Sequence, residues 1–324
     1  VHDVELILVL LAAVALLAAA AERTTIPYPI FLVLGGLALA VLPNVPAVQL
    51  DPDIVFVLLL PPILFSAAYD ASWRDFRANL RPISQLAVGA VLFTMLGVAV
   101  VAHAVIGGFG WPAAFVLGAI VAPPDAAAAT AIFQRLGAPR RVVTILEGES
   151  LVNDASALVA YRFAVAAVVT GSFSAWSAGG QFLVLVLGGI AVGIGAGWLM
   201  SRIIPAIGSP PVAVTASLLA PAAIYLGAER VGVSGVLATV VAGLVHGRSG
   251  AVIFDPTTRL GGETIWSFVV FVVNGLVFIL FGLQLRDIWS ALSGRTLAEL
   301  AGASLAVVVA VIATRFLWIY PGTY

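Results

Sequence analysis

The chain has 324 residues, of which 62% are hydrophobic and only 10% are charged, and its mean hydropathy is +1.14. A soluble domain of this length needs more polar residues to cover its surface, so the composition predicts a membrane protein. The chain has no cysteine and a formal net charge of −1, which excludes a disulfide framework or a thiolate metal site within it and gives no indication of a nucleic-acid partner.

Apolar segments follow one another along the whole chain. A transmembrane helix needs about 20 mostly apolar residues, and by that measure the sequence predicts about eleven transmembrane helices. The segments are 4–21, 26–43, 53–69, 83–106, 111–134, 142–170, 181–204, 211–228, 231–247, 264–285 and 297–320. We therefore expect an all-α polytopic membrane protein with short connections, in which residues 1–324 form a single transmembrane domain.

Arginine is unevenly distributed between the connections. Those after odd-numbered segments hold ten arginines, namely Arg23, Arg74, Arg77, Arg81, Arg135, Arg140, Arg141, Arg202, Arg248 and Arg259, and those after even-numbered segments hold three, Arg230, Arg286 and Arg295. Basic connections tend to stay in the cytoplasm. The pattern thus predicts a multi-pass protein of the cell inner membrane with its N-terminus outside, and the cytoplasmic stretch Asp70–Arg81 is predicted to form a short amphipathic helix.

The fifth segment contains Val121-Ala122-Pro123-Pro124-Asp125 at its middle. Two consecutive prolines remove two backbone donors, so the helix must break there. Carbonyls freed at this depth are tolerated only when they are buried in protein or line a polar cavity. Two interpretations remain open, a kink in which Asp125 caps the next half-helix and a discontinuous helix that forms an ion site.

The sixth segment opens with Glu147-Gly148-Glu149-Ser150-Leu151-Val152-Asn153-Asp154. Ser150 and Asp154 are four residues apart and share a helix face, and Asp154 lies well inside the apolar run. A charged side chain at the bilayer centre costs about 2.5–3.5 kcal/mol, so we expect Asp154 to have a function.

Two other charged features of this segment have simpler interpretations. From the sequence alone, Glu147 and Glu149 are interpreted as lying at the cytoplasmic end, where they balance Arg140 and Arg141. Arg162 lies two turns beyond Asp154, and three roles remain open for it: a contact with Asp154, extension toward the membrane surface, or a pair with Glu229.

A carboxylate on the sixth segment that faces a broken fifth segment would offer oxygen ligands only. Such ligands suit Na⁺ or Li⁺, and the site has no soft ligand for a transition metal, so no cofactor is expected. A carboxylate shielded from water that holds either a proton or a cation performs exchange by competition between them. If Asp154 alone binds the proton and the cation, one proton is exchanged for one monovalent cation and no net charge moves. If Asp125 also titrates, the stoichiometry differs.

At these residues the chain resembles the cation:proton antiporter-1 family, the sodium/proton exchangers of bacteria and animals. The family motif Gly-Glu-Ser-Leu-x-Asn-Asp is matched without a gap by Gly148–Asp154, and Asp125 is similar to the aspartate of its broken-helix motif, although here the prolines precede that residue. Leu60–Phe65 and Asn274–Phe278 also resemble family motifs, and the resemblance covers in effect the whole chain.

The resemblance implies a role for each site residue. Asp154 would be the central proton and cation carboxylate, Asn153 would mark an electroneutral subtype, and Glu149 with Arg315 would form a structural pair. The cation ligands would be Asp154, Asn153, Asp125, Ser150 and the carbonyl of Pro124. The family is typically a homodimer that works by an elevator-like movement of a core domain.

The family also has a second broken helix, expected just after Pro321, whereas the sequence stops at Tyr324. We therefore expect an antiporter inverted-repeat fold truncated at the C-terminus, lacking the last one or two spans.

Several other functions remain open at this point. One is K⁺/H⁺ antiport, another is a channel, and a third is a transport-inactive, truncated membrane interaction protein. An intramembrane hydrolase would need Ser150 as nucleophile and His103 or His246 as base. Both histidines are predicted near segment ends, where they are interpreted as interfacial residues.

Overall fold

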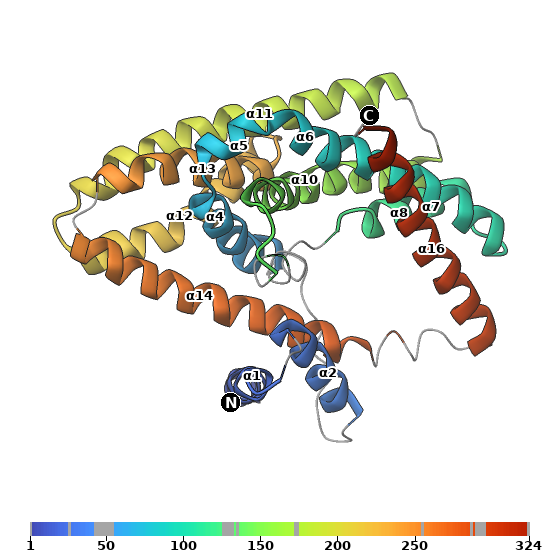
Figure 1. Ribbon diagram of the computed structural model, residues 1–324, viewed down its shortest axis with the longest axis horizontal. Coiled ribbons are helices and arrows are strands. Elements are labelled where there is room, and N and C mark those ends of the chain that lie inside the picture. Colours follow the sequence, from blue (N-terminus) through green and yellow to red (C-terminus); the bar gives the residue numbers. More distant parts are fainter. Residues whose placement is uncertain are drawn as a thin grey trace. The chain divides into compact units, whose positions relative to one another are not determined.

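A computed structural model describes residues 2–24, 27–41, 55–124, 133, 136–171, 175–253, 256–285, 288 and 296–322. Every regular element in these ranges is a helix, as the composition predicted (Figure 1). The second half of the predicted fifth segment, which begins at Asp125, lies outside the described residues except for Phe133.

The backbone divides into two compact units. Unit 1 comprises residues 1–66, 204–222 and 253–295, and unit 2 comprises residues 67–203, 223–252 and 296–324. Unit 1 contains α1 (His2–Ala21), α2 (Tyr28–Val41), η1 (Val55–Leu59), η3 (Ile204–Ala206) and α14 (Pro256–Leu283). Unit 2 contains α5 (Trp73–Ala78), α6 (Leu80–Ser84), η2 (Gln85–Ala90), α7 (Val91–Val105), α8 (Trp111–Val121), α10 (Arg140–Thr170), α11 (Ala175–Ile203), nearly all of α13 (Gly235–Ile253) and α16 (Leu297–Gly322). Helices α4 (Leu60–Asp70) and α12 (Pro210–Arg230) contribute residues to both units, and the single exchanger domain stays a prediction.

Six helices of the described chain are long and apolar enough to cross a membrane: Leu80–Val105, Arg140–Thr170, Gly179–Ala206, Pro210–Arg230, Gly261–Leu283 and Leu297–Pro321. Five shorter apolar helices occupy Leu8–Ala21, Tyr28–Val41, Val55–Asp70, Trp111–Val121 and Gly235–Arg248. These helices overlap the eleven apolar segments of the sequence one for one, which confirms a helical, multi-pass architecture. The number of true crossings stays a prediction.

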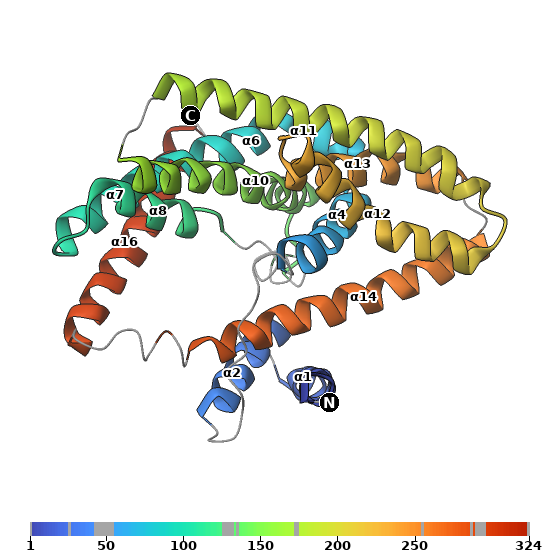
Figure 2. The ribbon, with the colours of Figure 1, turned by 180° about the vertical axis from the view of Figure 1, so that it is seen from behind.

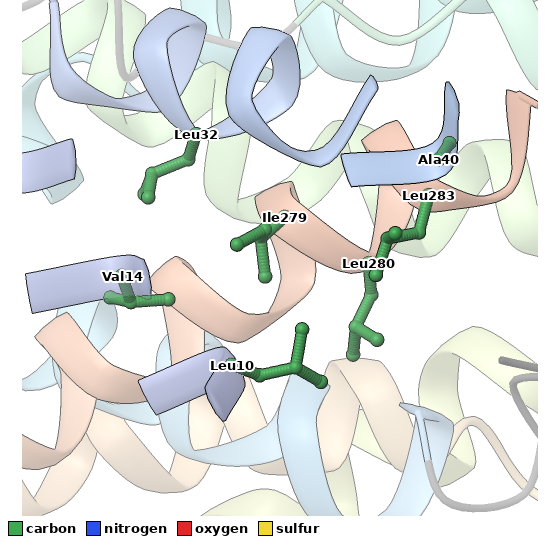
Figure 3. Close-up of a cluster of buried hydrophobic side chains, with 7 residues drawn as sticks. All are labelled: Leu10, Val14, Leu32, Ala40, Ile279, Leu280 and Leu283. Carbon is green, nitrogen blue, oxygen red and sulfur yellow. The ribbon is translucent and has the colours of Figure 1, made fainter. Parts of the chain in front are cut away.

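Unit 1 has a core of aliphatic side chains where α1, α2 and α14 meet (Figure 3). Leu32 of α2 and Ile279 of α14 are fully buried in it, and Val14 of α1 is 1% exposed. The rings of Tyr28 and Phe271 extend the contact between α2 and α14, with centroids 6.0 Å apart.

Glycine lets α2 and α14 approach closely. A Cβ on Gly36 would collide with the carbonyl oxygen of Ile279, and one on Gly282 would collide with the carbonyl oxygen of Val33. Association of membrane helices depends on such small residues, because lipid tails are as apolar as the side chains and provide no hydrophobic drive.

In unit 2, α7 packs against both α8 and α16, and α8 also packs against α10 (Figure 2). A small-residue contact lies between α7 and α8, where Ala99 and Ala102 cluster with Ala114. Gly97 of α7 is opposite Thr314 of α16, and Gly89 of η2 is opposite Trp318. These two contacts fix the register of α16 along α7.

The glycine-rich sequence of α11 packs against α13. Gly189, Gly193 and Gly197 are one turn apart, and a Cβ on each would lie 2.9, 2.6 and 2.7 Å from the carbonyl oxygens of Ser234, Ala238 and Ala242 respectively. The repeat therefore serves close helix packing within unit 2, as expected for small residues at i and i+4.

The registers also give the relative directions of paired helices. Residue numbers rise together along α2 and α14, from Tyr28 with Phe271 to Gly36 with Ile279, and also along α11 and α13, so both pairs are parallel. They run in opposite senses along α7 with α8 and along α7 with α16. If successive apolar segments cross the membrane in alternating directions, each of these four helix pairs must have the direction observed.

The glycine contacts can be tested by alanine substitution. We expect Gly36→Ala to lower the thermal midpoint of the purified full-length protein, because overpacking against a backbone oxygen costs about 1–3 kcal/mol and a carbonyl cannot turn away as a side chain does. The matched control is Gly195→Ala on α11, where a Cβ meets nothing within 4 Å and the better helix propensity of alanine applies. Equal midpoints for the two variants would contradict the close approach.

Candidate functional site

The helix break at the prolines is the structural centre of the candidate site. Helix α8 ends at Val121, the amide of Ala122 still donates to the carbonyl of Gly118 at 3.0 Å, and Pro123 and Pro124 follow without donors of their own. The last carbonyls of a helix have no partner within it. At membrane depth, side chains from elsewhere must supply those hydrogen bonds.

Two distant residues bond the carbonyls at this break. Nη2 of Arg315, on α16, donates to the carbonyl of Ala122 at 2.8 Å. Nδ2 of Asn153, on α10, donates to the carbonyl of Pro124 at 3.1 Å. Residues of α10 and of the distant α16 therefore meet where α8 stops.

Asn153 has no exposed surface, and its Oδ1 has no hydrogen-bond partner among the described residues. The carbonyl of Pro124 can only accept, so the amide nitrogen must face it and Oδ1 must point elsewhere. A buried polar atom left unsatisfied costs about 1–3 kcal/mol. Oδ1 is therefore a pre-positioned oxygen whose lone pairs suit a cation or another donor.

Glu149 and Arg315 form an ion pair beside this amide. The side chain of Glu149 is 5% exposed and that of Arg315 is 15% exposed. The charge-balance interpretation of Glu149 from sequence was wrong, since the residue is buried and Arg141 instead donates from Nε to Oδ1 of Asn79 at 3.1 Å. The one-dimensional pattern assigned Glu149 to its nearest arginines, whereas its partner lies 166 residues away.

The other predicted site residues lie on the same stretch of α10 or next to the break. Asp154 and Ser150 are both half-buried on α10, four residues apart. Asp125, the residue after Pro124, lies outside the described residues. The structure thus brings together Pro124, Asn153, Glu149 and Arg315.

Sequence reasoning gave Ser156 no role, although it is one of few polar residues in its run. Ser156 is buried and donates to the carbonyl of Ala87, and its Oγ is also 2.9 Å from the carbonyl of Asn153. Ala87 lies in η2, a π-helical turn, and such turns free carbonyls and occur often at functional sites. Ser156 therefore ties η2 to the turn of α10 that carries Asn153 and Asp154.

Arg162 pairs with Glu229, which selects one of the three roles left open. Nη2 of Arg162 lies 3.0 Å from Oε2 of Glu229, and Oε1 of Glu229 accepts from the amide of Gly235 at 3.0 Å. Glu229 thus links α10 to the start of α13. The side chain of Arg162 is 42% exposed, so this pair is far more accessible than the pair of Glu149 with Arg315.

Both histidines have other partners. His246 is buried, with Nδ1 3.0 Å from Oγ of Ser201 and its ring 5.6 Å from that of Tyr69. The structure buries the His246 ring inside the protein, and its position near the membrane edge stays a prediction. His103 is exposed, and its Nδ1 lies 2.7 Å from the carbonyl oxygen of Phe109. These contacts do not favour a hydrolase that uses either ring as the base for Ser150.

The described residues contain no group of three or more histidine, cysteine, aspartate or glutamate side chains that could hold a metal ion. The oxygens at the end of α8 come instead from the side-chain amide of Asn153 and from the main-chain carbonyls of Ala122 and Pro124. Fold and site together define a multi-pass helical membrane protein with a buried polar centre at the end of α8.

Comparison with known proteins gives the family. The sequence profile of the family "Sodium/hydrogen exchanger, transmembrane" matches residues 9–324. An uncharacterized Na⁺/H⁺ exchanger of Mycobacterium tuberculosis is 35% identical over the whole chain, which covers 59% of that protein. The sodium, potassium, lithium and rubidium/H⁺ antiporter of Bacillus pumilus is 34% identical over 91% of the chain and 46% of its own length.

The solved structures agree on the fold. The sodium proton antiporter MjNhaP1 of Methanocaldococcus jannaschii is similar with a TM-score of 0.73 at 19% identity, over 98% of this chain and 93% of that chain. The chain belongs to the transmembrane sodium/hydrogen exchanger family, whose members are transporters and not enzymes. It spans between about half and three-fifths of the length of the curated relatives described above.

The ion pair beside the break can be tested by removing one partner. We expect Arg315→Ala to destabilise the protein by about 3–5 kcal/mol, because a buried carboxylate is left uncompensated and the Ala122 carbonyl loses its donor. Adding Glu149→Gln should restore part of the loss, since it removes the unpaired charge. The measurement is the thermal midpoint of the purified full-length protein and the fraction that elutes monodisperse.

Arg162→Ala is the matched control for that experiment. Its pair with Glu229 is much more exposed, and exposed pairs contribute about 0–1 kcal/mol. If Arg162→Ala and Arg315→Ala lowered the midpoint equally, or if Glu149→Gln gave no rescue, a structural role for the buried pair would be wrong.

Proposed function

We propose that the full-length protein is a secondary active antiporter that exchanges a monovalent cation, Na⁺ and also Li⁺, for H⁺, and that this chain provides its ion site. The observation that carries the proposal is the buried Oδ1 of Asn153, held without a hydrogen-bond partner among the described residues and one position before Asp154. Membership of the exchanger family and the names of its relatives support the same reaction.

In this proposal Asp154 is the carboxylate that binds either the proton or the cation. Oδ1 of Asn153, Oγ of Ser150, Asp125 and the carbonyl of Pro124 are further ligands. All are hard oxygen donors, which suit alkali cations. The hydrogen bond from Asn153 to Pro124 supports their proximity, because it holds the amide oxygen on the side of α10 next to the helix break.

Exchange follows from competition at one carboxylate. A bound cation and a bound proton each neutralise Asp154, so the loaded site has the same charge in both states. Asn153 is neutral and the pair of Glu149 with Arg315 has no net charge. We therefore propose electroneutral exchange of one cation for one proton.

A second candidate cargo is K⁺. The relatives from Bacillus pumilus and Bacillus subtilis, 34% and 33% identical, are both named as antiporters of sodium, potassium, lithium and rubidium. Oxygen ligands alone do not discriminate between these ions, so K⁺/H⁺ exchange by the same site is the alternative to be measured beside Na⁺.

The exchange can be measured in everted vesicles that contain the full-length protein. We expect Na⁺ to collapse an imposed acid-inside gradient in the wild type, and the Asp154→Asn variant to fall to the level of vesicles without the protein, because it has no titratable group there. Asp75→Asn is the control, since Asp75 is exposed on α5. Parallel additions of Li⁺ and K⁺ give the selectivity.

Two outcomes would count against the proposal. If Asp154→Asn and the wild type collapse the gradient equally with every cation, Asp154 is not the exchange carboxylate. Thiocyanate, a permeant anion, removes the membrane potential, and a change in the wild-type rate on its addition would show that net charge moves.

We also propose that the protein lies in the cell inner membrane with the connections after odd-numbered segments in the cytoplasm. The support is the excess of arginine in those connections.

The topology can be tested by cysteine labelling. The chain has no cysteine, so an introduced cysteine is the single reactive thiol once any cysteine elsewhere in the full-length protein is replaced. An impermeant maleimide on intact cells should label Val231→Cys, on the outer side, and leave Ser209→Cys unlabelled; the reverse result would invert the topology.

A homodimer is the remaining part of the proposal. Its support is the family resemblance alone, and light scattering of the purified protein in detergent is the measurement. A mass of one subunit at all concentrations would contradict it.

A further inference from the structure

Unit 2 contains a second candidate site, a basic pocket away from the helix break. The pocket has a volume of about 470 Å³ and is lined by Trp73, Arg74, Arg77, Ala78 and Arg248. Three of these five residues are arginines, two from α5 and one from α13. We call this site the arginine pocket.

Close packing explains why these arginines meet. A Cβ on Gly247 would collide with the carbonyl oxygen of Tyr69, and the His246 ring lies against the Tyr69 ring, with centroids 5.6 Å apart. This contact brings the part of α13 that carries Arg248 to the end of α4. Helix α5 begins only four residues after Tyr69, so Arg74 and Arg77 face the same space.

Helix α5 is itself held in place. Phe76 is buried, and a Cβ on Gly148 of α10 would lie 3.3 Å from its ring. Asn79, which ends α5, accepts from Nε of Arg141 at 3.1 Å. The wall that carries Arg74 and Arg77 is therefore anchored to α10.

The pocket brings three positive charges together. Within the part of the chain that the structure describes, none of the three guanidinium groups forms an ion pair with a carboxylate. Like charges gathered in one hollow repel one another, and an anion bound between them removes that repulsion. Guanidinium groups present forked donors that match the oxygens of a phosphate.

We propose that the arginine pocket binds the phosphate of an anionic phospholipid headgroup. Arg74 and Arg77 lie in the third connection and Arg248 in the ninth, and the arginine distribution predicts the same membrane face for both. Clustered arginines at the cytoplasmic face attract anionic lipids. Trp73 contributes an indole, a side chain enriched at the headgroup level, which favours a lipid over a soluble phosphate compound. This inference does not depend on the proposed exchange.

Lipid titration of the purified full-length protein, followed by native mass spectrometry, tests the proposal. Phosphatidylglycerol should bind at least about tenfold more tightly than phosphatidylcholine, because only its headgroup carries net charge. Arg77→Gln and Arg248→Gln should each weaken phosphatidylglycerol binding about fivefold, the change expected for losing about 1 kcal/mol per basic residue. Arg202→Gln is the control, since Arg202 lies in another predicted cytoplasmic connection and its guanidinium stacks over Trp198 at 5.3 Å.

A second arm, with inorganic phosphate or glycerol phosphate in place of lipid, distinguishes the two sources of the phosphate group. Arginine-dependent binding of these soluble compounds, with no preference for phosphatidylglycerol over phosphatidylcholine, would overturn the lipid assignment. Unchanged lipid affinity in both pocket variants would overturn the site itself. Thermal midpoints in phosphatidylcholine alone, equal for all variants, establish that lost binding is not lost folding.

Discussion

The need to satisfy the main-chain carbonyls at the end of α8 organises unit 2. Pro123 and Pro124 cannot donate, so the helix ends at Val121 and its last carbonyls need donors from other helices. Arg315 supplies one donor and Asn153 another. A buried arginine in turn requires a counter-charge, and Glu149 provides it. The carbonyls at the end of α8 are therefore bonded by residues of α10 and α16.

Small residues position these donors. Thr314 lies opposite Gly97 and Trp318 opposite Gly89, so the height of α16 along α7 is fixed one residue before and three residues after Arg315. Gly118 lets α8 approach the backbone of Met95 closely. Packing distances and hydrogen-bond geometry are thus coupled, and a bulkier side chain at either glycine of α7 and η2 would displace Arg315 from the Ala122 carbonyl.

The positions of the helices along the chain could be predicted from the sequence, but the contacts between distant residues could not. Hydropathy located the apolar helices, and the paired prolines located the end of α8, because both depend on neighbouring residues alone. Pairings between distant residues were beyond that reasoning: Glu149 was assigned to Arg140 and Arg141, and the contact of His246 with Ser201 was not predicted. The resemblance to a family named Glu149 with Arg315 together, although nothing in their spacing does. Asp125, predicted at the start of the second half-helix, lies outside the described residues.

The distribution of charge at the break bears on how exchange would be coupled. The pair of Glu149 with Arg315 contributes no net charge, and Asn153 uses a neutral amide to bond the Pro124 carbonyl. An aspartate at 153 could not donate that bond when ionised, and it would add a second titratable group. The amide of Asn153 thus has two effects: it donates a hydrogen bond to the carbonyl at the end of α8, and it adds no charge to the site. In the proposed exchange, a proton and a cation then compete for the same negative charge on Asp154, and neither can be bound without releasing the other.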